Sequence, residues 1–206
     1  SSKSYHHGNL KQELILCACR LCEEHGYESL SMRSIAKESG VSQTAPYRHF
    51  DTKESLYAYV AMEGFKKLSA ATNIDISKKV TKDNLVKTGV NYINFGLDNA
   101  NTYDLMFGTA VGDFSSYPDL LDCANATYEN MKLSFSKLSD DSDEIIAYKC
   151  ITLWSMLHGL VGILRKVAVV DELDPEQNDG PIKSASLIGD NLDVHLDKVL
   201  TGIIQS

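Results

Sequence analysis

The chain has 206 residues, 43% of them hydrophobic, and its 20 Lys and Arg against 28 Asp and Glu give a formal net charge of −8. This apolar content excludes a disordered or collagen-like chain, and the length suits one or two compact domains. Four Pro, 13 Gly and little alternation of apolar with polar residues favour an all-α fold over many short strands.

The sequence indicates neither a secretory signal nor a membrane span. Residues 1–10 lack an apolar core, as a signal peptide would need. The most apolar run, Thr152–Val170, is interrupted by a His, an Arg and a Lys, which is typical of a buried helix. We therefore expect a cytoplasmic protein.

Three of the five cysteines lie close together, at Cys17, Cys19 and Cys22. On a helix, Cys17 and Cys19 point roughly 200° apart, so the three sulfur atoms cannot converge on one metal ion. Cys19 and Cys22 can share a face. We expect reduced cysteines that pack as small apolar residues.

Charge is divided unevenly along the chain. Residues 1–68 contain nine Lys and Arg against eight Asp and Glu, a balance of +1, whereas residues 69–206 contain eleven against twenty, a balance of −9. The anionic second part repels a polyanion, whereas the nearly neutral first part can touch one through locally clustered cations.

The first third of the chain predicts two helices joined by a tight turn. An apolar stripe at Leu10, Leu14, Ala18 and Leu21 predicts a first helix, which ends at Gly26. Ser31 caps a second, short helix that ends at Gly40.

Two more helices are predicted after Gly40. Ser42 caps a third short helix over residues 43–50, in which Pro46 costs little because it lies near the start. Thr52 caps a fourth helix, with Leu56, Val60, Gly64 and Leu68 at every fourth position. A helix, a three-residue turn that starts with Gly and a second helix are the sequence form of a helix-turn-helix.

Longer helices are predicted beyond residue 71, over residues 85–97, 103–108 and 117–138. An acidic run at residues 139–144 suits the start of a long helix, whose two apolar stripes must be covered on two sides.

A polar loop over residues 171–181 precedes a final helix over residues 184–203. Because these last two helices form an apolar hairpin that can pair with a copy of itself, we expect a homodimer.

One ordered pattern spans residues 26–56, Gly-Tyr-x-x-x-Ser-Met-Arg-x-Ile-Ala-x-x-x-Gly-Val-Ser-x-x-x-x-Tyr-x-His-Phe-x-x-Lys-Glu-x-Leu. It closely resembles the DNA-binding domain of the TetR family of transcriptional regulators. Residues 5–10, Tyr-His-His-Gly-Asn-Leu, and 154–159, Trp-Ser-Met-Leu-His-Gly, look like the subgroup named for a Trp-His-Gly signature. Cys22 departs from the family's usual Phe, and Ser31 replaces its commoner Thr.

The resemblance implies a three-helix helix-turn-helix domain at residues 1–56, followed by a helical ligand-binding and dimerisation domain at residues 57–206. Residues 43–49 would be the recognition helix, which enters the major groove. Gln43 suits adenine edges, Thr44 and Ala45 a thymine methyl group, and Arg48 guanine or phosphate. The resemblance implies phosphate contacts for Tyr47 and His49. The full set of expected DNA contacts is Ser31, Arg33, Ser42, Gln43, Thr44, Ala45, Tyr47, Arg48, His49 and Lys53.

Four of the expected DNA contacts have an ordinary alternative. Ser31 and Ser42 can serve as helix caps only, Tyr47 can be part of the core, and Arg33 can be a solvated surface charge.

The resemblance also places an inducer pocket in the C-terminal domain, suited to an apolar or aromatic molecule. Aromatic and thioether side chains supply the candidates, and each has an alternative role as an ordinary core residue. These candidates are Tyr92, Phe95, Tyr103, Met106, Phe107, Tyr128, Met131, Trp154 and His158.

The function implied is a repressor that binds a pseudo-palindromic operator as a homodimer and is released by a small inducer. The alternative is a helical small-molecule-binding or adaptor protein whose helix-turn-helix only packs. Signatures of metallohydrolases, dinucleotide sites and phosphate loops do not occur in the sequence, so we expect no enzyme, no cofactor and no metal.

Overall fold

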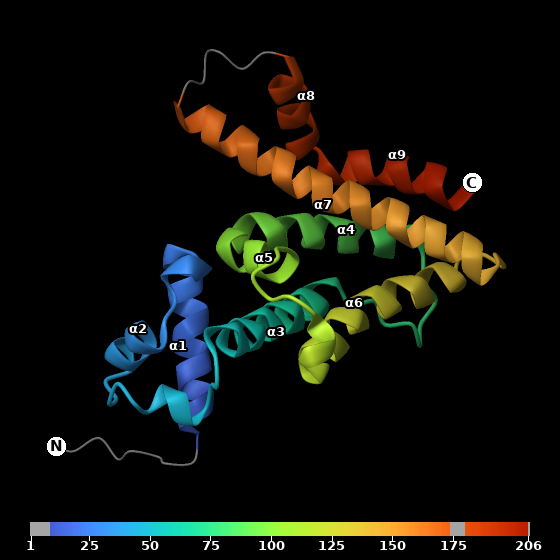
Figure 1. Cartoon of the computed structure of the whole chain (residues 1–206). Coiled ribbons are helices and arrows are strands. Elements are labelled where there is room, and N and C mark those ends of the chain that lie inside the picture. The colour runs from blue at the N-terminus through green and yellow to red at the C-terminus, as the bar shows by residue number, and fades with distance from the viewer. Residues whose placement is uncertain (1–8, 174–179, 206) are drawn as a thin grey trace. The chain divides into compact units, whose positions relative to one another are not determined.

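The computed structural model describes residues 9–173 and 180–205, which form helices and, within those ranges, no strand (Figure 1). The all-α prediction is confirmed. The elements are α1 (Leu10–His25), η1 (Tyr27–Ser29), α2 (Met32–Glu38), η2 (Pro46–Arg48), α3 (Lys53–Thr72), α4 (Lys82–Asp98), α5 (Ala100–Phe107), η3 (Phe114–Ser116), α6 (Pro118–Ser136), α7 (Asp143–Leu173), α8 (Gly180–Gly189) and α9 (Leu192–Gln205).

The chain folds into two compact units that interleave along the sequence. The first unit combines the residues up to Lys67 with Asn99–Ala124, and the second combines Leu68–Asp98 with the residues from Asn125 onward. The expected division into residues 1–56 and 57–206 concerns function and stays a prediction.

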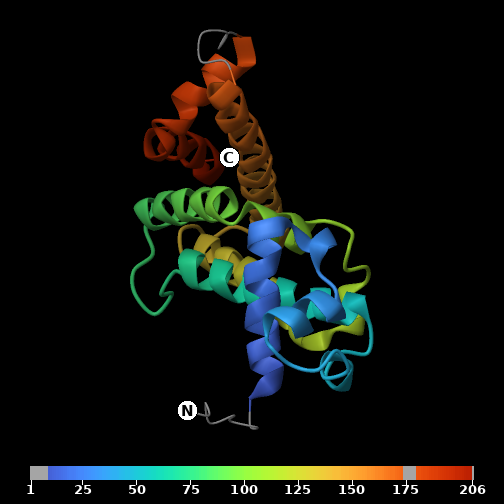
Figure 2. The same cartoon turned by 90° about the vertical axis from the view of Figure 1, so that its left-hand side faces the viewer.

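The predicted ends of α1 and α2 are confirmed. Leu14 and Ala18 of the α1 stripe are fully buried, and α1 stops before Gly26, whose φ of 81° is one that residues other than glycine rarely adopt. The hydroxyl of Ser31 accepts from the N–H of Ser34 at 2.9 Å, and the hydroxyl of Ser34 accepts from the N–H of Ser31 at 2.9 Å. This reciprocal cap fixes the start of α2, which lies beside α1 (Figure 2).

The predicted third helix over residues 43–50 is wrong in kind and in length. Residues 43–45 form a turn, and only η2 follows, a single turn of 3₁₀-helix. Pro46 has no N–H to give to the carbonyl of Ser42, so the first α-helical hydrogen bond of the predicted helix is missing. Most backbone bonds of the stretch instead span three residues: Ala45 to Ser42 at 3.0 Å, Arg48 to Ala45 at 3.2 Å and His49 to Pro46 at 2.9 Å. One bond spans four residues, from the N–H of Phe50 to the carbonyl of Pro46 at 3.0 Å.

The predicted helix after Thr52 is confirmed as α3. The hydroxyl of Thr52 accepts from the N–H of Ser55 at 3.0 Å, and the expected stripe residues Leu56 and Val60 are fully buried. Gly64, in the same stripe, faces α5 at close range. A Cβ added there would lie 2.5 Å from Met106 Sδ and 2.9 Å from Thr102 Cγ2. The absence of a side chain at Gly64 therefore sets how closely α3 and α5 pack in the first unit.

We expect Gly64→Ala to destabilise the protein by about 1–3 kcal/mol, because the added methyl group overlaps the side chains of Met106 and Thr102, which must shift. The matched control is Gly202→Ala, since Gly202 lies in α9 and an added Cβ there meets nothing within 4 Å. The control should be more stable than the wild type by up to about 1 kcal/mol, because alanine has the higher helix propensity. Urea denaturation of both variants measures the difference, and equal stability would show that α5 yields freely.

The second unit is built around α7, which packs against α4, α8 and α9 (Figure 1). Gly89 of α4 lies where these helices meet, since an added Cβ would be 3.0 Å from Leu196 of α9 and 3.4 Å from Leu157 of α7. Lys149 of α7 is 5% exposed. Its Nζ donates to Asp141 Oδ2 at 2.8 Å and to the carbonyl of Ile204 at 2.9 Å. One buried ammonium group therefore joins the start of α7 to the last turn of α9.

The predicted single helix over residues 184–203 is wrong, because the structure contains two helices, α8 and α9, that break at Asp190 and Asn191. Gly, Asp and Asn in succession at 189–191 have low helix propensity, and the side chain of Asn191 bonds to the carbonyl of Leu187 at 3.1 Å. The predicted loop over residues 171–181 is shorter than expected, with α7 reaching Leu173 and α8 starting at Gly180. Residues 174–179 lie outside the described residues.

Among the residues that the structure describes, one helix, Asp143–Val170 of α7, is long and apolar enough by composition to cross a membrane. Buried residues make up 33% of its most apolar stretch. All six residues of the first predicted stripe are buried, namely Ile146, Cys150, Leu153, Leu157, Leu160 and Leu164. The second stripe was predicted at Ala147, Ile151, Trp154, His158 and Val161; of these, Val161 is buried, whereas Ile151 is 47% and Trp154 38% exposed. One of the two predicted stripes is therefore covered within the chain, and much of the other is not.

Candidate nucleic-acid interface

The expected DNA contacts come from three short stretches of the first unit: the start of α2, residues 42–49 and the start of α3. Ser31, Ala45 and His49 are half-buried. The remaining members are exposed, namely Arg33, Ser42, Gln43, Thr44, Tyr47, Arg48 and Lys53. Their role in binding DNA stays a prediction.

Two buried residues hold the exposed stretch in place. Pro46 is buried, and Phe50 is 1% exposed with its ring 5.6 Å from that of Tyr59. Between them, Tyr47 is 62% exposed, which excludes the alternative that Tyr47 is a core residue in this chain. The stretch therefore has apolar anchors at Pro46 and Phe50, with polar side chains presented to solvent between them.

Of the two predicted caps, the structure contains the one at Ser31 but not the one at Ser42, because η2 begins after Ala45 and has no side-chain cap. Ser31 caps α2, as described above, and Ser42 Oγ lies 3.3 Å from Thr44 Oγ1. A capping hydroxyl at a helix N-terminus also lies where a phosphate group binds best, because the first N–H groups of the helix point outward there. The two interpretations of Ser31 are therefore compatible.

Lys53 is held close to the backbone that leads into α2. Its Nζ donates to the carbonyl of Glu28 at 3.4 Å and lies 5.3 Å from the centre of the Tyr57 ring. Neither contact neutralises the charge, so the ammonium group keeps its attraction for an anion while its position is restricted.

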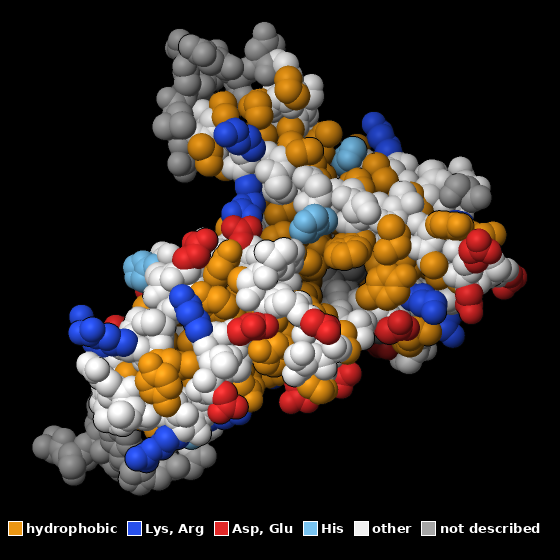
Figure 3. All heavy atoms as spheres, viewed as in Figure 1, with side chains coloured by type: hydrophobic (Ala, Val, Ile, Leu, Met, Phe, Trp, Pro, Cys, Tyr) orange, Lys and Arg blue, Asp and Glu red, His pale blue; other side chains and the backbone are white. Residues whose placement is uncertain are grey.

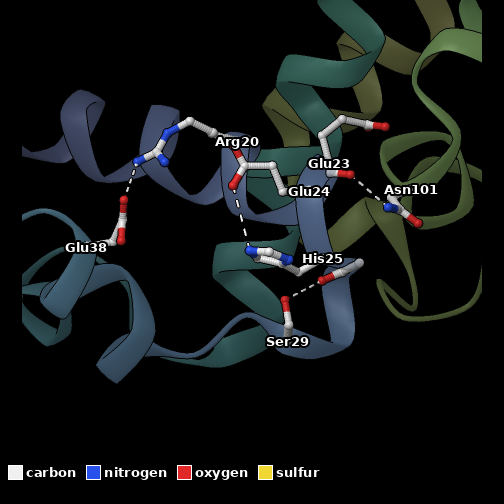
Figure 4. A network of polar contacts seen from close by, with 8 residues as sticks. Arg20, Glu23, Glu24, His25, Ser29, Glu38 and Asn101 are labelled. Atoms are coloured by element: carbon white, nitrogen blue, oxygen red, sulfur yellow. Dashed lines mark hydrogen bonds and ion pairs between the residues drawn. The ribbon is translucent and has the colours of Figure 1, made fainter.

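An ion pair joins the two helices that lead into this surface. Arg20 of α1 reaches Glu38 of α2 at 3.0 Å (Figure 4). Arg33, Lys37 and Arg48 have no carboxylate within 4.0 Å among the described residues. Sequence reasoning missed Lys37, although its position four residues after Arg33 on one helix places both cations on one face. Figure 3 shows Lys and Arg side chains over the region of α1 and α2.

The predicted inducer contacts fall into separate groups. In the second unit, Trp154 Nε1 donates to the Tyr92 hydroxyl at 3.1 Å, and the rings of Trp154 and His158 lie 6.3 Å apart. Tyr92 is 5% exposed, whereas Trp154 is 38% exposed. The structure therefore brings Tyr92, Trp154 and His158 together.

The remaining candidates are divided between the two units. Phe95 is buried on α4, and Tyr128 and Met131 are half-buried on α6. Tyr103, Met106 and Phe107 belong to the first unit, where the ring of Phe107 packs 4.6 Å from Tyr103 and 5.5 Å from Phe65. Whether any of these nine residues binds a ligand stays a prediction.

Comparison with known proteins concerns mainly the expected DNA contacts of the first unit. Residues 14–60 match the family model described as "Bacterial regulatory proteins, tetR family". The chain carries the TetR-family domain. The matched stretch includes every expected DNA contact from Ser31 to Lys53 and the whole of α2 and η2.

The chain is also similar to a curated relative over a short stretch. It is 38% identical over 55 residues to the HTH-type transcriptional repressor AcnR of Corynebacterium glutamicum. That stretch covers 27% of this chain and 29% of the repressor, so the two match over less than a third of their lengths.

Solved structures share the fold over nearly the whole chain. A protein of unknown function from Rhodococcus sp. RHA1 is 19% identical, covers 99% of this chain and 98% of its own, and has a TM-score of 0.69. A single-residue variant of TetR from Acinetobacter baumannii AYE, solved in complex with minocycline, is 18% identical and has a TM-score of 0.63. The match covers 93% of this chain and 94% of that variant. At these identities the likeness shows the fold, in which the TetR-family domain is followed by a helical region.

In this TetR-family domain the cysteines of α1 are packing residues, as predicted. Cys17 and Cys22 are buried, and Cys19 is half-buried. Burial raises the pKa of the Cys22 thiol to about 12 and that of Cys19 to about 11, so both stay protonated at neutral pH. Within the described residues, no group of three His, Cys, Asp or Glu is placed to hold a metal ion.

Outside the TetR-family domain, a groove that the sequence did not suggest lies between α4 and α9. Its volume is about 540 Å³. None of the nine predicted inducer contacts lines it. The lining combines valines with charged residues, namely Asp83, Val86, Lys87, Val90, Asp193, Val194, Asp197 and Lys198.

Proposed function

We propose that this protein is a ligand-responsive transcriptional repressor, which binds a pseudo-palindromic DNA operator as a homodimer and is released by a small apolar or aromatic inducer. The observation that carries the proposal is the TetR-family domain with its exposed polar stretch at residues 42–49. Its similarity to the repressor AcnR supports a repressing role. Such a protein acts in the cytoplasm, on DNA.

The exposed residues divide into two kinds of contact. Arg33 and Lys53 carry positive charges beside helix starts, which suits phosphate contacts that fix the register of the protein on DNA. Gln43 and Arg48 have side chains able to form two hydrogen bonds to a base edge, which suits sequence recognition in the major groove.

A homodimer is supported by the uncovered face of α7. Large apolar side chains there are exposed, with Tyr148 at 66%, Ile151 at 47%, Ile163 at 50% and Val169 at 48%. Figure 3 shows hydrophobic side chains over the region of α7 and α8. An apolar face of this kind on a long helix suits pairing with a copy of itself. Two recognition stretches would then reach half-sites about 34–36 Å apart, or further along the same face of the DNA.

An inducer site is supported by Trp154 and Tyr92, whose hydrogen bond joins α7 to α4 in the second unit. Aromatic rings with one or two polar groups suit an apolar or aromatic molecule with a polar handle. The similar TetR variant from Acinetobacter baumannii was solved with a small molecule, minocycline, which supports a ligand-responsive role for this fold. Quenching of Trp154, the single Trp of the chain, offers a direct readout of binding.

The test of DNA binding starts with selection of bound duplexes from a random pool, followed by titration of the selected site at several salt concentrations. We expect Arg33→Ala and Lys53→Ala to weaken binding to all sequences alike. Each should also lower the slope of log K against log salt concentration by about one, because one phosphate contact is lost. Gln43→Ala should instead change which sequence is preferred, with a cost of about 1–3 kcal/mol on the best site. Equal effects of all three variants would contradict these roles.

The alternative of a helical adaptor without sequence-specific DNA binding predicts a different result. In that case selection enriches no sequence, and the three substitutions leave binding unchanged. The exposed polar stretch at residues 42–49 favours the repressor, because a helix-turn-helix used only for packing would cover those side chains.

A further inference from the structure

The segment that joins α5 to α6, residues 108–117, is not used by the proposed function. It leaves α5 at Gly108, where an added Cβ would collide with the carbonyl oxygen of Asp104. Val111 is 2% exposed, and the ring of Phe114 lies 6.0 Å from that of Phe65 on α3. The segment therefore runs along α3 within the first unit, and we call residues 108–117 the strap.

The strap has a polar contact at the start of α3. The N–H of Gly112 donates to Glu54 Oε1 at 3.3 Å. The Tyr117 phenol lies beside the same carboxylate. Burial and then the negative charge of Glu54 raise the pKa of this phenol.

A second carboxylate ties the start of α5 to α1. Glu23 accepts from the N–H and hydroxyl of Thr102 at 3.1 and 2.7 Å. Figure 4 shows the adjoining bond between Asn101 and Glu23. The polypeptide from residue 101 to residue 117 is thus tied to the DNA-binding part at both ends.

Glu54 is the immediate neighbour of Lys53, which the proposed function assigns to a phosphate group. A carboxylate at the second residue of α3 stabilises that helix through its dipole, but it repels DNA if it points toward the backbone. A hydrogen bond that fixes the carboxylate therefore changes the field that a phosphate group meets at Lys53.

We propose that the Gly112–Glu54 hydrogen bond is a latch, by which the strap holds the Glu54 carboxylate away from the DNA and so preserves the phosphate contact of Lys53. Glu54 is then a positioning residue, and release of the strap lowers DNA affinity. This inference rests on the proposed function, because it assigns a role to the neighbour of a DNA contact.

A double-mutant cycle on the full chain tests the latch. Gly112→Pro removes the N–H that Glu54 accepts, whereas Gly112→Ala keeps it, and the added Cβ would lie 3.7 Å from Glu54 Oε1, an ordinary contact. Glu54→Gln keeps an acceptor oxygen and removes the charge. The probe is a mixed-sequence DNA duplex of about 30 base pairs at low salt, where phosphate contacts dominate.

We expect Gly112→Pro to weaken binding about fivefold, and Gly112→Ala to bind like the wild type. In the Glu54→Gln background, Gly112→Pro should have no further effect, because no charge remains to be released. Phe114→Ala loosens the strap through another contact and should repeat the same pattern. Thermal unfolding of each variant checks that it folds.

The latch is overturned if Gly112→Pro and Phe114→Ala weaken binding equally in both backgrounds, which indicates general damage to the segment. It is also overturned if neither substitution weakens binding while the wild type binds the duplex. Failure of the wild type to bind any duplex would overturn the proposed function itself, so the two failures are distinguishable.

Discussion

Replacing Ile151 with Asp on the uncovered face of α7 is expected to separate the proposed homodimer into monomers and to abolish operator binding. Ile151 is 47% exposed in one protomer and lies on the apolar face that also carries Tyr148 and Ile163. Burial of an unpaired carboxylate between two copies costs several kcal/mol, and a symmetric interface contains the substitution twice. The dimer dissociation constant should therefore rise by at least about a thousandfold.

Sedimentation equilibrium over a range of protein concentrations measures this change. The matched control is Leu16→Asp, because Leu16 is 56% exposed on α1 and belongs to the first unit. We expect the control to remain dimeric and Ile163→Asp to behave like Ile151→Asp. A dimer that survives both α7 substitutions would show that another surface, such as the α4–α9 groove, forms the interface.

Replacing Lys149 with Met should produce the largest loss of stability, a fall of about 5–10 °C in Tm. Lys149 is buried, and its ammonium group is the partner of both Asp141 and the carbonyl of Ile204. Methionine keeps most of the apolar stem but leaves both oxygen atoms without this donor. The last turn of α9 should then exchange its amide hydrogens faster than in the wild type.

The control for this substitution is an ion pair at the surface. Lys78 is 80% exposed and lies 3.2 Å from Asp75. Because exposed pairs contribute little, Lys78→Met should change Tm by less than about 3 °C. Equal losses in the two variants would indicate that the burial of Lys149 adds nothing to its contact with Asp141.

The same contact predicts a dependence on pH. The hydrogen bond from Lys149, and a smaller contribution from Ser139, hold the pKa of Asp141 below its ordinary value of 3.8. A carboxylate with a lowered pKa in the folded state stabilises that state above the ordinary value, and the stabilisation is lost as the pH falls through the lowered value. The stability difference between wild type and Lys149→Met, measured in urea, should therefore be full near neutral pH and shrink below pH 3.8.

The sequence predicted the helices best where their ends have a local cause. The cap at Ser31, the stop at Gly26 and the cap at Thr52 depend on the residue itself and its near neighbours, and the structure contains all three. The prediction of the third helix was wrong because the effect of Pro46 depends on which backbone hydrogen bonds form around it. Here most of those bonds join residues three apart, as in a 3₁₀-helix.

The candidate site was predictable to different degrees. A family pattern covers the TetR-family domain residue by residue, so the ten expected DNA contacts all lie within the matched stretch, and most of them are exposed. The inducer contacts were chosen only as aromatic and thioether residues on helices. That criterion cannot separate Tyr103, which packs in the first unit, from Tyr92, which pairs with Trp154 in the second. The strap was not predictable because its contact with Glu54 joins residues 58 apart.

The short η2 stretch has a consequence for how such a protein diverges. Its shape depends on Pro46 and Phe50, which are buried, and on backbone bonds that any residue can make. Gln43, Thr44, Tyr47 and Arg48 are exposed, so substitutions there cost little folding stability. Under the proposed function, single exchanges at these four positions would therefore change the operator sequence that is bound, while the scaffold beneath them stays the same.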